Sequence, residues 1–133
     1  MPIRKSTRNA FPKGMAMSKI FIAEDDPALT RLLKLMLERA GHQISVFSSG
    51  EAALDALADD PPDALIMDID RPGASGRALC ERIDARLPQR TFPIFAMTSA
   101  HGDGDQAWTQ EIHDLFFLEK PVSSKSLISP ERD

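Results

Sequence analysis

Side chains that could carry out chemistry follow directly after several apolar runs of the chain. Asp68 and Asp70 stand one residue apart at the end of the run ALIM. The other runs are followed by Glu24-Asp25-Asp26, by Thr98-Ser99 and by Glu119-Lys120-Pro121. Carboxylates held close together repel one another, and a divalent cation between them removes that repulsion. Oxygen ligands completed by water suit Mg²⁺, and the chain offers no Cys/His set for zinc.

A carboxylate beside Mg²⁺ is equipped for phosphoryl transfer when a hydroxyl and an ammonium group lie nearby. The metal and Lys120 would neutralise charge on the phosphoryl oxygens, and Thr98 would donate a hydrogen bond. The carboxylate would attack the phosphorus in line, and the product would be an aspartyl phosphate. The alternative interpretation of the acidic group 24–26 is an ordinary helix start, since acids are favourable there.

The elements that must bring these residues together are five short strands. We expect them at residues 19–23, 43–47, 63–68, 92–97 and 115–118. Their nearly continuous apolar character indicates burial on both faces, which requires a parallel sheet with helices on each side. The predicted fold class is therefore a doubly wound α/β domain. In such folds the ligand site lies beyond the carboxyl ends of the strands.

Helix signals separate the predicted strands. Asp26 can cap a helix that has Pro27 in its first position and stops at Gly41. Further helices are predicted from Glu51 to about Ala58, from the loop containing Gly76 to about Arg86, over residues 103–113 and after the cap residue Ser123.

Composition limits the class of protein. The 133 residues suit one domain, and no stretch is apolar enough for a membrane helix. Residues 1–18 are predicted to be a basic, disordered extension, and residues 19–133 the folded domain. The acidic balance of that domain argues against a nucleic-acid partner. Cys80 is the single cysteine, so we expect a buried thiol, no internal disulfide and a cytoplasmic protein.

Four motifs occur in one order along the chain: AEDDP, IMDIDRPGASG, MTSA and FLEKP. With these motifs the chain resembles the receiver domains of two-component response regulators, over residues 19 to about 128. The resemblance implies a flavodoxin-like (βα)₅ fold and a stand-alone signalling domain without independent enzymatic turnover. It also implies a phosphohistidine donor, on a histidine kinase or a histidine phosphotransfer protein, and a downstream protein target.

The resemblance also assigns roles to individual residues. Asp68 would be the phosphoacceptor. Asp25 would bind Mg²⁺ directly, Glu24 through water, and Asp70 through its backbone carbonyl. Thr98 and Lys120 would contact the phosphoryl group. Phe117 stands at the position of the switch aromatic, Ala100 leaves room for the donor, and the bond from Lys120 to Pro121 would be cis.

Two alternatives from other classes stay open at this point. The pair of Asp68 and Asp70 resembles the paired aspartates of haloacid dehalogenase-type phosphatases, although those follow the first strand. A receiver-like module that is never phosphorylated is the second alternative. The carboxylate of Asp70 departs from many receivers, and we expect it to alter the lifetime of an aspartyl phosphate. The polar segment before the fifth strand also departs from the family, which affects its usual signalling face.

Overall fold

The computed structural model describes residues 18–48, 50–69, 75–98 and 110–120. The described helices are α1 (Pro27–Arg39), α2 (Gly50–Asp59) and α3 (Ser75–Arg86). The strands are β1 (Lys19–Ala23), β2 (Gln43–Phe47), β3 (Ala64–Asp68), β4 (Ile94–Thr98) and β5 (Leu115–Glu119). Within these ranges no helix has the length and apolar character needed to cross a membrane.

The strands form one sheet in the order β2-β1-β3-β4-β5, and every neighbouring pair is parallel. The predicted doubly wound α/β fold is therefore confirmed. Asp68 pairs with Met97, and Thr98 pairs with Glu119. Because all strands run in the same direction, the residues that end β1, β3, β4 and β5 meet at one edge.

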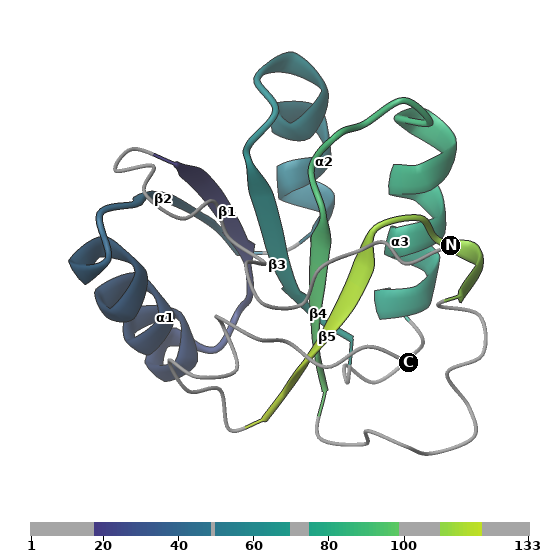
Figure 1. Ribbon diagram of the computed structural model, residues 1–133. Coiled ribbons are helices and arrows are strands. Elements are labelled where there is room, and N and C mark those ends of the chain that lie inside the picture. The colour runs from purple at the N-terminus through teal and green to yellow at the C-terminus, as the bar shows by residue number, and fades with distance from the viewer. Residues whose placement is uncertain (1–17, 49, 70–74, 99–109, 121–133) are drawn as a thin grey trace.

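Helices cover both faces of the sheet, and each face has its own core. On one face, Leu33 and Leu37 of α1 pack against Ile22 and Ile66. On the other face, α2 and α3 pack against the opposite side chains of the strands. Figure 1 shows this division, with α1 apart from α2 and α3. Strands β3 and β4 are buried along their whole length, as the interior of a parallel sheet requires. The expected burial is wrong for β2, whose residues are exposed or half-buried because it lies at the edge of the sheet.

Helix α1 begins and ends where its sequence signals predict. Oδ1 of Asp26 accepts hydrogen bonds from the backbone N–H of Ala28 at 3.0 Å and of Leu29 at 3.4 Å. At the other end Gly41 has a φ of 99°, a left-handed conformation that glycine adopts without strain. The N–H groups of Gly41 and His42 donate to the carbonyls of Glu38 and Leu37, which satisfies the last turn.

Several predicted bounds differ from the structure, and strand β3 begins at Ala64 rather than at residue 63. Strand β4 begins at Ile94, because Pro93 has no amide hydrogen for the ladder, and it continues through Thr98. Strand β5 extends to Glu119. The helix predicted over 103–113 does not reach His113, since residues 110–111 form a short 3₁₀ turn. The rest of that helix and the helix after Ser123 lie outside the described residues.

The single cysteine has the predicted place in the core. Cys80 on α3 is fully buried, and its Sγ lies 3.8 Å from Sδ of Met67. Burial raises the pKa of the Cys80 thiol to about 12. The thiol is therefore protonated at neutral pH and is unreactive as a nucleophile.

Candidate functional site

The clearest contact at the carboxyl edge of the sheet joins two residues 52 positions apart. Nζ of Lys120 lies 2.8 Å from Oδ2 of Asp68 and donates a hydrogen bond to it. Asp68 ends β3 and is only 9% exposed, and Lys120 directly follows β5. The backbone N–H of Lys120 donates to the carbonyl of Thr98 at 3.0 Å, which fixes the lysine beside the end of β4.

Glu24 is the second carboxylate that the fold buries at this edge. It directly follows β1 and is only 4% exposed. Its Oε2 accepts a hydrogen bond from the backbone N–H of Asp26 at 2.9 Å. Its Oε1 is buried and accepts no hydrogen bond from any residue that the structure describes. Such an atom is costly to bury unless a donor or a cation satisfies it.

The surroundings of Glu24 disfavour its ionised form. Burial raises the pKa of the Glu24 carboxyl, and the nearby negative charge of Asp68 raises it further. The side chain of Asp25 contributes in the same direction. Two ionised carboxylates cannot hydrogen-bond to each other, so Oε1 of Glu24 needs either a shared proton or a cation as its partner. The donor set is therefore suited to a hard divalent cation such as Mg²⁺.

The protein side chains do not form a complete cage for such an ion. Among the described residues, no group of three or more His, Cys, Asp or Glu side chains is arranged to hold a metal by itself. Mg²⁺ commonly keeps several waters and uses only one or two carboxylates. The partial donor set at Glu24 and Asp68 is compatible with that mode of binding.

The structure brings most of the predicted site residues together. Glu24, Asp68, Thr98 and Lys120 all lie where strands end at the same edge, and Thr98 is fully buried. Asp25 follows Glu24 and is exposed at that edge. Asp70, Ala100 and the bond from Lys120 to Pro121 involve residues outside the described part. Phe117 is 2% exposed and belongs to the core on the side of α2 and α3.

One residue that helps to shape the site was not singled out from the sequence. A Cβ atom on Gly76, near the start of α3, would lie 2.7 Å from Cα of Ile69. Ile69 directly follows Asp68, and its N–H donates to the carbonyl of Met97 at 3.1 Å. Glycine thus allows α3 to start against the backbone that leaves β3. The only sequence signal was a glycine at the start of a helix.

Comparison with known families agrees with this geometry. The family model described as response regulator receiver domain matches residues 20–130. The chain belongs to the response regulator receiver domain family. The receiver domain is a signalling module of two-component systems, and all the described strands and helices lie in the matched range apart from Lys19. This assignment disfavours the haloacid dehalogenase-type phosphatase as an alternative.

Characterised relatives of this receiver domain differ in length. It is 33% identical to the transcriptional regulatory protein AfsQ1 of Streptomyces coelicolor over 111 residues, 84% of this chain and 48% of AfsQ1. It is 27% identical to protein PilH of Pseudomonas aeruginosa over 112 residues, 84% of this chain and 93% of PilH. The chain thus spans about half of AfsQ1 and nearly all of PilH.

Solved structures resemble the receiver domain over a similar range. A CheY-like response regulator receiver domain from Methylobacillus flagellatus is 31% identical, with a TM-score of 0.71 over 84% of this chain and 92% of that one. The receiver domain of the sensor histidine kinase PA1611 from Pseudomonas aeruginosa is 25% identical, with a TM-score of 0.70 over 83% of this chain and 90% of that one. The PA1611 structure is described with a magnesium ion coordinated in its active site cleft.

Proposed function

We propose that this receiver domain accepts a phosphoryl group on Asp68 from a phosphohistidine of a partner protein. The observation that carries the proposal is the contact of Lys120 with Asp68, which gives a nearly buried carboxylate a fixed ammonium neighbour. The family match supports the same role, since a receiver is the part of a two-component system that receives the signal.

The transfer step exchanges one bond for another. A carboxylate oxygen of Asp68 attacks the phosphorus, and the bond from phosphorus to the histidine nitrogen breaks. The nitrogen keeps the electron pair and takes up a proton, which leaves a neutral imidazole. Lys120 stabilises charge on the phosphoryl oxygens, and the hydroxyl of Thr98 donates a hydrogen bond to one of them. Thr98 ends β4, the neighbour of β3 in the sheet, and Lys120 follows β5, one strand further out, from where its side chain reaches Asp68.

Asp25 and Asp68 are the described residues that would bind a Mg²⁺ ion directly, Glu24 would bind it through water, and Asp70 is proposed to contribute its backbone carbonyl. When bound, the ion supplies positive charge that offsets the repulsion between the acceptor and the phosphoryl oxygens. The buried, unsatisfied Oε1 of Glu24 supports this assignment. The magnesium ion described in the PA1611 receiver domain supports it as well.

The partners follow from the chemistry of the step. The donor is a phosphohistidine on a histidine kinase or on a histidine phosphotransfer protein, and we propose that both meet the domain in the cytoplasm. The phosphorylated domain would then pass the group on or contact a downstream protein. We propose that residues 19–133 carry these functions, and that residues 1–18 are an extension outside the phosphoacceptor machinery.

The proposal is tested by the intact mass of the full chain after incubation with Mg²⁺ and acetyl phosphate, a small donor that needs no partner. We expect a gain of one phosphoryl group in the wild-type chain. The gain should be absent without Mg²⁺ and absent in Asp68→Asn. As a matched control, Asp63→Asn changes an exposed aspartate at the opposite edge of the sheet and should leave the gain intact.

The alternative outcomes separate the remaining functions. The folded wild-type chain could gain no mass with acetyl phosphate or with a phosphorylated histidine phosphotransfer protein. That result would identify the protein as a phosphorylation-independent interaction module. Equal gains in the wild-type chain and in Asp68→Asn would place the acceptor elsewhere. Continuous release of phosphate from a generic phosphomonoester would favour a phosphatase instead.

A further inference from the structure

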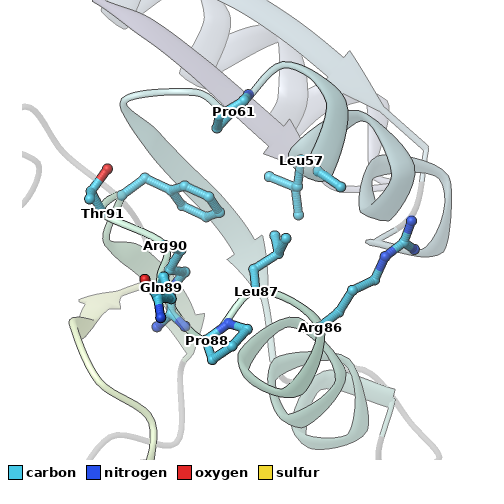
Figure 2. A pocket seen from close by; sticks show the side chains of 10 residues that line it. Leu57, Pro61, Arg86, Leu87, Pro88, Gln89, Arg90 and Thr91 are labelled. Carbon is cyan, nitrogen blue, oxygen red and sulfur yellow. The ribbon is translucent and has the colours of Figure 1, made fainter.

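A pocket lies at the edge of the sheet opposite to the phosphoacceptor. It has a volume of about 330 Å³ and is lined by the end of α2, the segment after α3 and the residues that precede β3 and β4. Figure 2 shows Leu57 and Leu87 pointing toward one another across it, with Pro61 and Pro88 on either side. Arg86 extends away from the pocket in the same view.

The walls of this pocket are suited to an apolar side chain. Two leucines, two prolines, Ala58 and the buried ring of Phe92 are six of the ten residues that line it. The buried guanidinium of Arg90 is already engaged, because it contacts Asp84 at 2.6 Å and the carbonyl of His113. The volume is at the lower end of the range for pockets that bind small molecules. A single aromatic side chain presented by a peptide segment is therefore a better fit than a cofactor.

The amino-terminal segment of this chain enters the domain beside the pocket. Nζ of Lys19, at the start of β1, lies 2.6 Å from Oδ1 of Asp60, the residue directly before Pro61. The backbone N–H of Lys19 donates to Asp63 at 2.7 Å. Phe11 is seven residues before Ser18, so an extended chain gives it a reach of about 24 Å. Phe11 is also the one aromatic residue in the sequence of positions 1–17.

The charges of the amino-terminal segment and of the surface beside the pocket are complementary. The sequence of residues 1–17 holds four basic residues, Arg4, Lys5, Arg8 and Lys13, and no acidic residue. Four exposed aspartates stand along α2 and the turn into β3, namely Asp55, Asp59, Asp60 and Asp63. Lys19 and Arg86 pair with Asp60 and Asp55 and offset only part of this negative charge. Attraction of this kind would favour the approach of a basic segment to this edge.

We propose that residues 1–17 dock along this edge, with Phe11 inserted between Leu57, Leu87 and Pro88 and with the basic residues beside the aspartates of α2. The contact is made within one chain. Because the pocket is at the amino ends of the strands, the docked segment leaves Asp68 accessible. The proposal therefore does not depend on phosphorylation, and its failure would leave the proposed function untouched.

The test is paramagnetic broadening in the ¹⁵N-labelled full chain. A nitroxide is attached at Asn9→Cys, and the buried Cys80 thiol with its raised pKa does not compete for the label. We expect the amides of Leu87, Gln89 and Thr91 to lose more than half of their intensity. The amides of Lys34 and Glu38 on α1, which packs on the other face of the sheet, should be unaffected.

Two sets of variants separate the contributions. Phe11→Ser should reduce the broadening at the pocket at least threefold, whereas Ile3→Ser should leave it nearly unchanged. Asp59→Asn with Asp60→Asn should weaken it by removing exposed charges without disturbing the core. The proposal would be overturned if the pocket amides were broadened no more than the other amides, or if Phe11→Ser left their broadening unchanged. A mixture of ¹⁴N chains that bear the nitroxide with ¹⁵N chains that do not tests for contact between two copies. Broadening in that mixture would also overturn the proposal, because it would assign the contact to a second copy.

Discussion

At the scale of single residues, the ion pair of Lys120 and Asp68 is the contact on which the proposed chemistry depends. Asp68 has an 11% exposed side chain, and that of Lys120 is 25% exposed, so solvent screens their attraction only in part. The same ammonium group would face the phosphoryl group in the product. The pair therefore contributes to the stability of the resting domain as well as to its chemistry.

Lys120→Met should lower the free energy of unfolding by about 1–2 kcal/mol, since it leaves the Asp68 carboxylate nearly buried without its donor. In an Asp68→Asn background the same change should cost much less. Urea unfolding of the wild-type chain, of Lys120→Met, of Asp68→Asn and of the double variant measures this coupling. Lys34→Met, which removes an exposed pair with Glu38, is the control and should cost about 0.5 kcal/mol or less. Additive costs at Lys120 and Asp68 would contradict the account.

Glu24 makes the opposite contribution to stability when no metal is bound. Its pKa is raised by burial and by Asp68, so the folded state holds the Glu24 proton more tightly than the unfolded state does. Stability is therefore lost as the pH rises from the unfolded pKa of Glu24 through its raised folded pKa. At pH values above the folded pKa of Glu24, the carboxylate is ionised in the folded domain and its burial destabilises the fold to the full extent.

Glu24→Gln should accordingly be more stable than the wild-type chain at neutral pH without Mg²⁺, since glutamine can still accept from the N–H of Asp26. The difference should shrink as the pH falls toward the ordinary carboxyl pKa. Urea unfolding at several pH values, with the exposed Glu38→Gln as the control, measures it. Adding Mg²⁺ should stabilise the wild-type chain more than Glu24→Gln. A constant stability difference across the pH range would disprove this explanation.

At the scale of elements, the start of α3 is fixed against the end of β3. The contact leaves no room for a side chain at Gly76. In an ordinary helix, replacing glycine by alanine is favourable by about 1 kcal/mol. Here the added methyl group would have to push Ile69, and with it the backbone next to Asp68, away from α3.

Gly76→Ala should therefore destabilise the domain, by about 1–3 kcal/mol, despite the better helix propensity of alanine. It should also slow phosphorylation of Asp68, because Ile69 directly follows the acceptor. Thermal unfolding and the rate of mass gain measure the two effects. Ala85→Gly, at an exposed position of α3, is the control for helix propensity alone and should not change the rate of mass gain. A stabilised Gly76→Ala would show that the contact is not restrictive.

At the scale of the whole molecule, a buried arginine joins segments that are distant in sequence. The side chain of Arg90 is 1% exposed and lies between Asp84 of α3 and the carbonyl of His113, before β5. The His113 ring also lies 3.2 Å from the Asp84 carboxylate. This network connects α3, the entry to β4 and the entry to β5 at the edge away from the phosphoacceptor.

Arg90→Met should cost about 2–3 kcal/mol of stability, since it removes the buried partner of Asp84 and one donor to a backbone carbonyl. The extent of phosphorylation at saturating donor should be unchanged at temperatures where the variant is folded. Arg77→Met, which removes an exposed pair with Glu81, is the comparison and should cost about 0.5 kcal/mol or less. Equal costs for both variants would contradict a structural role of the Arg90 network.

The sequence was sufficient for the order of the strands and for which polar residues lie where the strands end, because local signals carry both. Asp26 and Gly41 mark the ends of α1, and the polar residues after apolar runs mark the edge where strands end. Contacts between distant segments were not readable in this way. The exclusion of side chains at Gly76 depends on how α3 crosses Ile69, and the burial of Arg90 depends on where the turn before β5 lies. The polar pattern over 103–113 also favoured a helix that does not extend to its predicted end.

The most direct measurement of the central claim identifies the phosphorylated side chain itself. After phosphorylation by acetyl phosphate, borohydride reduces an aspartyl phosphate to homoserine, and peptide mass spectrometry locates that residue in the chain. The account predicts homoserine at position 68 alone, in a yield that follows the gain of intact mass. Homoserine at position 70 or 25 with Asp68 unchanged would contradict it.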